Sequence, residues 1–579
     1  MVDQRNDQII RVDMSSEQVV VEPMPESWLK LGGRALSARI LIEECEPGCD
    51  PLGPDNLLVL APGLLAGSSA PTSGRLSVGG KSPLTGGIKE ANVGGNPGQD
   101  LMKLGYRVVI VKGQPRDADA RFALEVNAEG VSIRAADEHR GKWNYALIDD
   151  LKESYSKTTS FVSIGPAGEL RLAGASVACT DADQDRHPAR HAGRGGLGAV
   201  MGAKGLKYVS VDPGRSPVRK PVLQKEWNTF NKKFSKEFLD GPAKDPFPKW
   251  GTSVLVEEAN SIYTLPYKNR VECRSPDVET LDGMRIVESF ETRGGGMHNC
   301  LKGCIVRCSN VVMDEKGEYK TSGLEFETLA LLGSNCGLAH WEDVADLDRL
   351  CDDVGLDTIE TGAAIAVYMD AGGMAWGDAE GAKGLLREIA EGTELGRQIG
   401  NGAVAVGRAQ KHHRVPSVKG QAIPAWDPRP IKSVGFTYCT SAMGADHTAG
   451  LVVELGQDDE EALLISRESQ IVNAVVDSSG FCQFLMPHLD DVRTFYGNFL
   501  GEEISRDEIV DQGWQCLEDE WEFNRRAGLG DEDDLMPDCM AQDEIGPDKL
   551  VWDVSADVVG KLYERPAQFR ESLFALRPG

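Results

Sequence analysis

The sequence predicts an α+β protein with more than one domain: a β-rich N-terminal part followed by mainly helical parts. The chain has 579 residues, several times the roughly 150 residues of an average domain. Residues 1–212 are rich in glycine and in short β-favouring runs, whereas helical periodicity dominates from about residue 222. Hydrophobic residues make up 41% and charged residues 26% of the chain, which is the balance of a globular protein.

The N-terminal 212 residues contain short apolar runs that are bounded by turn residues. "NLLVLAPGLL" (56–65) and "YRVVIVKG" (106–113) predict buried strands. Between them, "SGRLSVGGKSPLTGGIKEANVGGNPGQDL" (73–101) predicts loops or bent strands whose backbone comes close to another group. "AGRGGLGAVMGAKGLK" (192–207) predicts a glycine-rich turn that leads into a helix. No long internal repeat is visible.

The rest of the chain shows amphipathic helical periodicity. Helices are predicted over 347–355, 382–400 and 460–477, with glycines as their stops. The segment "PGRSPVRKP" (213–221) has the composition of a linker, and "HHRVPSVKGQAIPAWDPRP" (412–430) is Pro-rich and irregular. These segments predict three domains, at 1–212, 213–411 and 412–579.

Charge and composition exclude several classes of protein. The net charge is −28, from 62 basic and 90 acidic residues, and such a surface repels nucleic acid. No apolar run reaches the roughly 18 to 20 residues of a membrane helix, and the polar first residues show no signal-peptide pattern. We therefore expect a cytoplasmic protein without a membrane span. Thirteen cysteines, an odd number spread over a long chain, do not predict a disulfide scaffold.

One stretch is dense in cysteine. "NCLKGCIVRC" (299–308) places Cys300, Cys304 and Cys308 at spacings of four residues. Residues at this spacing share a helix face, so the stretch is compatible with a small apolar helix stripe as well as with a metal or cluster site. Cys45 and Cys49 form a weaker pair, and most of the other cysteines are expected to be small buried apolar residues.

A short pattern, Asp-x-x-Gly-apolar-[Asp/Cys], occurs twice, as "DDVGLD" (352–357) and "DSSGFC" (477–482). One copy is an ordinary helix C-cap, but two copies predict two similar pockets that offer carboxylates to a donor-rich ligand. The second copy ends in Cys482, a candidate fourth thiolate for the cysteine trio. Iron–sulfur clusters take four cysteines, whereas a four-cysteine zinc site usually has two close pairs.

Together with four further stretches, these motifs resemble the tungsten-containing aldehyde ferredoxin oxidoreductases. The stretches are "PTSGR" (71–75), "KSPLTGGIKEANVGG" (81–95), "AGRGGLGAVMGAK" (192–204) and "LEFETLALLGSNCG" (324–337). The resemblance runs from about residue 30 to beyond 482. It implies a β-rich N-terminal base domain that holds two pterins and is covered by two mainly helical domains.

The resemblance also implies the cofactors and their ligands. Tungsten or molybdenum would be held by two pterins, next to a 4Fe–4S cluster. The implied cluster ligands are Cys300, Cys304, Cys308 and Cys482, although the first two are spaced C-x3-C here and C-x2-C in the well-known members. The implied cofactor-binding residues are Asp352 and Asp357 for one pterin, Asp477 for the other, Arg75 for a phosphate, and Asn92 with the Ala192 carbonyl for a bridging magnesium. Carboxylates suit pterin N–H groups because charge-assisted hydrogen bonds are strong.

Acid–base residues are implied in two further motifs. In the family, a glutamate and a histidine stand beside the metal, and the matching residues are Glu325 or Glu327 in "LEFET" and His447 in "GADH". Alternate residues on a strand point in opposite directions, so only one of the two glutamates is expected to face the metal. Tyr438 is a weaker candidate for lining the pocket.

The implied reaction is the oxidation of an aldehyde to a carboxylic acid. No second cysteine cluster or nucleotide fingerprint is visible, so we expect the electrons to pass to ferredoxin or to an iron–sulfur subunit. One alternative is the reductive branch of the family, acting on carboxylates or aromatic thioesters, with Cys336 or Cys351 at the metal. Another is a single-cluster electron-transfer or structural protein without pterin, and a third is a structural zinc protein. The chain lacks a Glu-x-x-His motif, so an iron bridge between subunits is not predicted, and homo-oligomer formation stays open.

Overall fold

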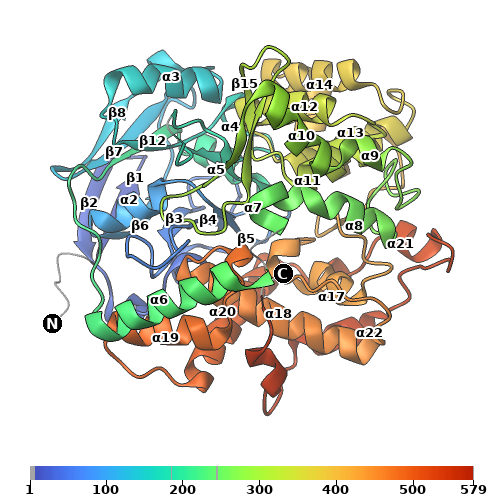
Figure 1. Ribbon diagram of the computed structural model, residues 1–579. Helices are drawn as coiled ribbons and strands as arrows, with labels where there is room; N and C mark the ends of the chain where they lie inside the picture. Colours follow the sequence, from blue (N-terminus) through green and yellow to red (C-terminus); the bar gives the residue numbers. More distant parts are fainter. Residues whose placement is uncertain (1–6, 184, 243–245, 578–579) are drawn as a thin grey trace.

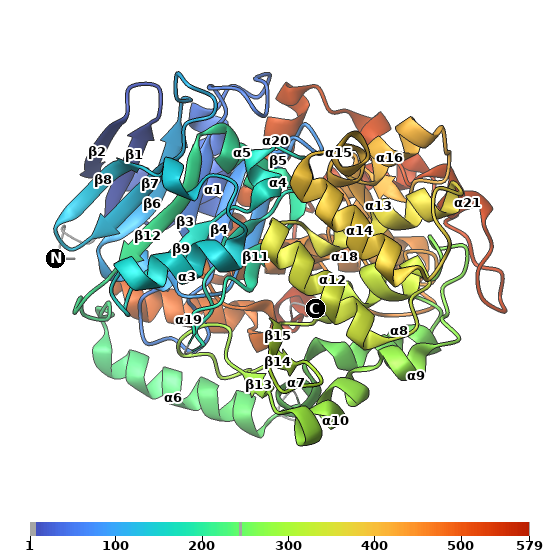
Figure 2. The same cartoon turned by 90° about the horizontal axis from the view of Figure 1, so that it is seen from above.

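The computed structural model describes residues 7–183, 185–242 and 246–577 and has a β-rich N-terminal part against which helices pack (Figure 1). All strands of its two large sheets lie between Gln8 and Asp212. In Figures 1 and 2 these sheets occupy one side of the molecule, and most helices of the later chain lie on the other side and along one face. The α+β fold class is confirmed, and the domain boundaries near 212 and 411 stay predictions.

Two six-stranded sheets form the N-terminal part. The first has the order β2-β1-β6-β3-β4-β5, and the second has the order β11-β10-β9-β12-β7-β8. The strands of the first sheet are β1 (Gln8–Asp13), β2 (Gln18–Pro23), β3 (Leu58–Pro62), β4 (Leu76–Lys81), β5 (Ile88–Val93) and β6 (Tyr106–Lys112). Those of the second are β7 (Phe122–Asn127), β8 (Gly130–Ala135), β9 (Ser160–Ser163), β10 (Val177–Cys179), β11 (Arg190–Ala192) and β12 (Leu206–Asp212).

The two sheets repeat one topology. Each begins with a hairpin, continues through a helix, three antiparallel strands and a second helix, and ends in a strand that pairs in parallel with the first strand. The helices in these positions are α1 (Gly33–Glu44), α2 (Pro97–Lys103), α3 (Asn144–Ser154) and α5 (Leu197–Ala203); the second half adds the short α4 (Pro166–Glu169). The sequence shows no matching repeat because a topology depends on hydrophobic pattern and turns, which different residues can satisfy.

Apolar side chains from both sheets pack into one cluster. It includes Val78 and Val109 from the first sheet and Val162 and Val209 from the second. Helices α2 and α5 contact strands of both sheets, so they lie between them. The strands predicted at 56–65 and 106–113 correspond to β3 and β6, and almost all their residues are buried. The edge strands β5 and β11 contact each other, which brings together the ends of the two sheets.

Helices dominate the rest of the chain, with two small sheets among them. The helices are α6 (Gln224–Asp240), α7 (Pro246–Trp250), α8 (Leu255–Ser261), α9 (Val278–Leu281), α10 (Gly283–Arg293), α11 (Phe326–Thr328), α12 (Trp341–Val354), α13 (Thr358–Asp370), α14 (Ala379–Glu391), α15 (Glu394–Gly400), α16 (Ala403–Gln410), α17 (Lys432–Thr440), α18 (Asp459–Ser479), α19 (Leu489–Leu500), α20 (Arg506–Ala527), α21 (Asp538–Gln542) and α22 (Ala556–Gly560). The small sheets are β13 (Gly296–His298) with β14 (Ser309–Met313) and β15 (Tyr319–Ser322), and β16 (Ser417–Val418) with β17 (Gln421–Ala422).

The predicted helices are confirmed with one change. Helix α12 covers the segment predicted at 347–355 up to Val354, with Gly355 as its C-cap, and α18 covers the segment predicted at 460–477. The segment 382–400 forms two helices, because Gly392 ends α14 with a φ of 70° and the Thr393 side chain caps the start of α15. Within the described ranges, no helix combines the length and the apolar run that crossing a bilayer requires.

Candidate active site

A cavity of about 570 Å³ is lined by residues of the N-terminal sheets and of the helical parts. Eleven of the thirteen residues predicted for the site line it. They are Arg75, Asn92, Cys300, Cys308, Glu325, Glu327, Asp352, Asp357, His447, Asp477 and Cys482. Cys304 and Ala192 are buried nearby in sequence, but they do not line the cavity.

The cysteine trio lies in a loop between β13 and β14, not in a helix. The helix-stripe interpretation of "NCLKGCIVRC" is therefore wrong. Thr72, in the "PTSGR" motif, connects this loop with the distant fourth cysteine. Its backbone N–H donates to the Gly303 carbonyl at 3.0 Å, and its carbonyl accepts from the Cys482 N–H at 3.0 Å. Thr72 itself has a φ of 54°, a conformation that is uncommon outside glycine.

The four predicted thiols influence one another's pKa values. A hydrogen bond with Cys304, together with burial, raises the pKa of Cys300, and the same bond lowers the pKa of Cys304. Burial raises the pKa of Cys308 and of Cys482, and Cys300 raises both further. No three His, Cys, Asp or Glu side chains of the described ranges are close enough to hold a single metal ion. A 4Fe–4S cluster needs four separate cysteine sulfurs, and this donor set, drawn from two distant segments, fits that requirement.

Each Asp-x-x-Gly motif ends a helix and docks on one of the two repeated sheets. Gly355 and Gly480, with φ values of 82° and 89°, are the C-cap residues of α12 and α18, as the motif predicted. A Cβ atom on Gly355 would lie 2.8 Å from the Gly165 nitrogen, and one on Gly63 would lie 2.1 Å from Gly480. Each motif glycine therefore packs against a glycine of the N-terminal part: Gly355 against Gly165, and Gly480 against Gly63. The two halves of the repeated topology each provide one of these contacts.

The three motif carboxylates face basic or amide groups. Asp352 lies 3.1 Å from His191 Nε2. Asp357 caps α13 by accepting from the Ile359 N–H at 3.0 Å, and it also lies 3.4 Å from Arg194 Nε.

Asp477 is the most strongly perturbed of these carboxylates. It accepts from Gln483 at 3.2 Å and lies 3.6 Å from Arg34. Burial, and next the Glu90 carboxylate, raise its pKa to about 8. A carboxyl group in this state is poised to pair with a donor-rich ligand, because such a ligand would replace the hydrogen bonds lost on burial.

Four basic side chains line the cavity. They are Arg75, Lys89, Arg190 and Arg194. Lys89 and Arg194 are buried, and Arg75 and Arg190 are half-buried. Only Arg75 was predicted; the other three lie inside or beside the quoted glycine-rich stretches but have no distinctive spacing. Four cations gathered at one cavity fit an anionic ligand such as a phosphate.

The two residues predicted for magnesium lie on the adjoining edge strands. Asn92 is on β5, where its side-chain oxygen accepts from Arg75 Nε. Ala192 ends β11 and pairs with Val177. Their strands contact each other, so the structure brings both residues to the junction of the two sheets.

Glu325 and Glu327 do not lie on a strand. Glu325 is the N-cap residue of the short helix α11, and Glu327 lies within it. Both line the cavity. The strand alternation on which the expectation depended is therefore absent, and which glutamate faces the metal stays a prediction. Glu325 accepts from the Thr252 hydroxyl and lies 3.9 Å from Arg190.

Glu327 and His447 face each other. One oxygen of Glu327, Oε2, accepts from the Ala425 N–H at 2.7 Å, and the other, Oε1, lies 3.7 Å from His447 Nε2. Glu327 Oε1 and His447 Nδ1 are buried without a hydrogen-bond partner among the described residues. Unpaired buried polar atoms are costly and call for a ligand, an ion or water.

Neighbouring residues hold His447 in place. Asp446 accepts from Lys89 Nζ and from the Thr448 N–H. Although burial opposes it, Lys89 and Arg194 keep the pKa of Asp446 below its usual value. The charged Asp446 thus anchors the turn that begins at His447.

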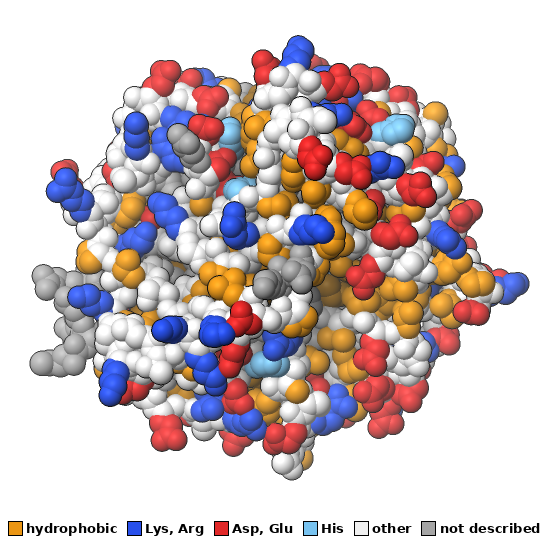
Figure 3. Space-filling model, viewed as in Figure 1, with side chains coloured by type: hydrophobic (Ala, Val, Ile, Leu, Met, Phe, Trp, Pro, Cys, Tyr) orange, Lys and Arg blue, Asp and Glu red, His pale blue; other side chains and the backbone are white. Residues whose placement is uncertain are grey.

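One side of the cavity is apolar. It includes Phe247 and Phe484, whose rings meet edge to face with centroids 5.1 Å apart, and Leu255, Leu451 and Val453. In Figure 3, apolar side chains gather around a hollow near the middle of the face shown. Apolar walls cannot pair with phosphates or pterin N–H groups, so this side suits the organic part of a substrate.

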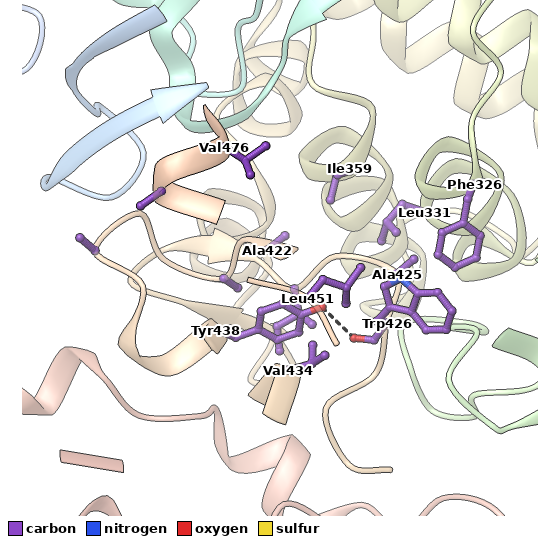
Figure 4. Packing of buried hydrophobic residues seen from close by; sticks show 14 of the residues in the cluster. Phe326, Leu331, Ile359, Ala422, Ala425, Trp426, Val434, Tyr438, Leu451 and Val476 are labelled. Atoms are coloured by element: carbon purple, nitrogen blue, oxygen red, sulfur yellow. Dashed lines mark hydrogen bonds between the residues drawn. The ribbon is translucent and has the colours of Figure 1, made fainter. Parts of the chain in front are cut away.

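Tyr438 is not part of the cavity lining, so that prediction is wrong. Its ring is fully buried and its hydroxyl donates to the Trp426 carbonyl at 3.0 Å (Figure 4). Trp426 lines the cavity, and Tyr438 supports it from behind. Cys336 and Cys351 are also buried away from the cavity lining.

Comparison with known proteins gives a consistent result. The family description "Aldehyde ferredoxin oxidoreductase, N-terminal domain" matches residues 9–213, and "Aldehyde ferredoxin oxidoreductase, domains 2 & 3" matches residues 229–565. The chain belongs to this family. The expected family resemblance is thereby confirmed, and with it the expectation of an oxidoreductase of the aldehyde ferredoxin oxidoreductase type.

Individual relatives agree with this assignment. The chain is 32% identical to the tungsten-containing aldehyde ferredoxin oxidoreductase of Pyrococcus furiosus and 31% identical to that of Thermococcus kodakarensis. Each comparison covers 93% of this chain and 92% of the relative. Among solved structures, the active-site complex BamBC of benzoyl coenzyme A reductase has a TM-score of 0.81, with 97% of this chain and 94% of that chain covered. Its 18% sequence identity supports the shared fold alone.

Proposed function

We propose that this enzyme oxidises aldehydes to carboxylic acids at a tungsten or molybdenum centre held by two pterins. The aldehyde and one water molecule give the carboxylic acid, two protons and two electrons. The observation that carries the proposal is the Glu327–His447 pair, which faces the same cavity as three of the four candidate cluster thiols and the three motif carboxylates.

The residues of the cavity fit these groups by charge and donor type. Asp352, Asp357 and Asp477 would accept hydrogen bonds from the pterins. The four cations of the cavity would hold the phosphates, and Asn92 with the Ala192 carbonyl would hold magnesium. The cluster ligands would be Cys300, Cys304, Cys308 and Cys482. When bound, the pterin-held metal and the cluster supply the electron-transfer chemistry, taking up an electron pair and releasing single electrons.

The protein's own part is to orient the aldehyde and to move protons. The Ala425 N–H holds Oε2 of Glu327 and leaves Oε1 facing His447. Either group can donate a hydrogen bond to the aldehyde oxygen while the other accepts a proton from water. The apolar wall around Phe247 and Phe484 would exclude further water and hold the substrate's organic part.

Electrons would leave through the cysteine loop. Lys302, Gly303 and Arg307 in this loop are exposed, although Cys304 between them is buried. A hollow of about 450 Å³ lies beside them and is also lined by Lys103 and Gln99. The positive charges of Lys103, Lys302 and Arg307 are local, because the whole chain has a net charge of −28. They would favour the approach of an acidic electron acceptor such as ferredoxin or an iron–sulfur subunit.

An anaerobic assay tests the proposal. Purified enzyme is mixed with a panel of aldehydes and methyl viologen, and the reduction of the dye is followed, with Glu327→Gln as the matched variant. We expect aldehyde-dependent reduction by the wild-type enzyme only. Reduction of an aromatic thioester or a carboxylate without any aldehyde oxidation would overturn the proposal in favour of the reductive branch.

A further inference from the structure

The Cys45–Cys49 pair lies outside the cavity. Cys45 is the C-cap residue of α1, and a tight turn in which the Cys49 N–H donates to the Glu46 carbonyl brings the second cysteine back to the first. Their sulfur atoms are 3.9 Å apart. Neither residue lines the cavity, so the proposed oxidoreductase reaction does not use this pair.

Two buried lysines fix the loop that carries the pair. Lys81 Nζ donates to the carbonyl of Cys49 at 2.9 Å and also to that of Pro47. Lys204 Nζ donates to the carbonyls of Gly53 and Pro54 at 3.0 and 3.1 Å. The loop is thus held from both ends, and the two sulfurs are kept together. A disulfide would require the two sulfurs to approach from 3.9 Å to about 2 Å.

The two thiols have different chemical character. The hydrogen bond from Cys45, assisted by the charges of Lys81 and Lys204, lowers the pKa of Cys49 to about 7. The same hydrogen bond and burial raise the pKa of Cys45. Cys49 is partly exposed, whereas Cys45 is only 3% exposed. A partly exposed thiolate beside a buried thiol is the arrangement of an attacking cysteine and a resolving cysteine.

The other cysteines outside the candidate cluster set differ from this pair. All seven are buried, and burial raises the pKa of each of them. They are Cys179, Cys273, Cys336, Cys351, Cys439, Cys516 and Cys539. Inert buried thiols of this kind serve as an internal comparison for the reactivity of Cys49.

We propose that Cys45 and Cys49 form a thiol–disulfide exchange site for low-molecular-weight disulfides. The Cys49 thiolate attacks one sulfur of the small disulfide, forming a mixed disulfide and releasing one thiolate. The Cys45 thiol, as it loses its proton, attacks the Cys49 sulfur and releases the second small thiol. Both protein thiols are oxidised to one intramolecular disulfide, and the small disulfide is reduced to two thiols, which take up the two protons. Excess dithiol reverses the reaction.

Mass spectrometry of the anaerobic holoenzyme tests the site. Trypsin cleavage after Arg39 and Arg75 gives a peptide, 40–75, whose only cysteines are Cys45 and Cys49. The enzyme is treated with oxidised glutathione, alkylated and digested. We expect this peptide to be unalkylated and lighter by two hydrogen atoms, and to regain two alkyl groups after dithiothreitol. Without oxidant at pH 7, Cys49 should be alkylated roughly tenfold faster than the buried thiols.

Three variants separate the roles of the two cysteines. In Cys45→Ser, the glutathione adduct should remain on Cys49, because the resolving thiol is missing. In Cys49→Ser, peptide 40–75 should carry neither adduct nor disulfide, and the control Cys516→Ser should react as the wild type does. Two results would overturn the proposal. One is a wild-type peptide 40–75 that still has both thiols free after oxidised glutathione, and the other is a Cys45→Ser peptide that carries no glutathione adduct. The readout is independent of aldehyde oxidation, so failure of either proposal is recognised separately.

Discussion

The Nε2 atom of His447 lies 3.7 Å from Oε1 of Glu327, inside the cavity that the N-terminal sheets and the later helices enclose. Glu325, two residues before Glu327, points instead to Thr252 and lies 3.9 Å from Arg190. This difference in surroundings gives the two glutamates different expected roles in proton transfer.

Glu327→Gln is expected to lower kcat by roughly 10² to 10⁴-fold, because an amide cannot exchange the proton that a carboxyl group transfers. Steady-state rates with an aldehyde and a viologen dye measure the effect. Glu325→Gln should lose less than about tenfold on the same scale. Equal and mild effects of the two changes would mean that neither glutamate is catalytic.

His447→Ala should abolish turnover but leave the content of tungsten or molybdenum, pterin and iron unchanged. The reason is that Asp446 and Lys89 hold the turn in place without the imidazole ring. Elemental analysis and a rate assay on the same preparation give both quantities. A wild-type rate would remove His447 from the mechanism.

Cys482→Ser should lose cluster iron and activity, because a serine hydroxyl replaces one of four thiolate ligands. Iron content and the absorbance of the cluster measure the loss. Cys516→Ser, a change at a buried thiol away from the cavity, is the matched control and should keep its iron. Unchanged iron in Cys482→Ser would refute the assignment of the fourth ligand.

The raised pKa of Asp477, about 8, predicts a pH dependence of stability. The folded cofactor-free protein keeps a proton that the unfolded chain releases above about pH 4. Stability should therefore fall as the pH rises from about 4 to about 8. Thermal melts at several pH values measure the slope, which Asp477→Asn should flatten and the exposed Asp548→Asn should not. Equal slopes in the wild type and Asp477→Asn would contradict the assignment.

Reversing the charge of the exposed loop residues, as Lys302→Glu with Arg307→Glu, should weaken the reaction with ferredoxin. We expect a KM for ferredoxin that is several-fold higher at low salt, because like charges repel an acidic partner. The dye-linked rate should be unchanged, since the small dye needs no docking surface. Lys549→Glu, on an exposed turn outside this loop, is the control. A double variant with a normal KM for ferredoxin would exclude this loop as the docking site.

Several parts of the fold and site could be predicted because they leave a local pattern. Cys300, Cys304 and Cys308 stand out by their spacing, and Asp477 and Cys482 by the repeated motif. Buried strands such as β3 and β6 follow from continuous apolar runs between turn residues. These features depend on neighbouring residues, so a single sequence carries them.

Other parts depend on contacts between distant segments. Lys89, Arg190 and Arg194 are isolated basic residues, and only the docking of the sheets and helices makes them neighbours of one cavity. The orientation of Glu327 could not be predicted because a three-residue helix, α11, replaces the expected strand. The repeat of the two sheets could not be predicted either, because its halves share a topology and not a sequence. The equivalent positions just before β4 and β10, for example, hold Arg75 and Ser176.

The central claim is that one cavity holds a pterin-bound metal beside an iron–sulfur cluster. The most direct measurement is the content of tungsten, molybdenum, iron and released pterin in one anaerobic preparation. The account predicts about four iron atoms per chain, together with pterin and one of the two heavy metals. Intact cluster iron without pterin or heavy metal, or zinc in place of iron, would contradict it.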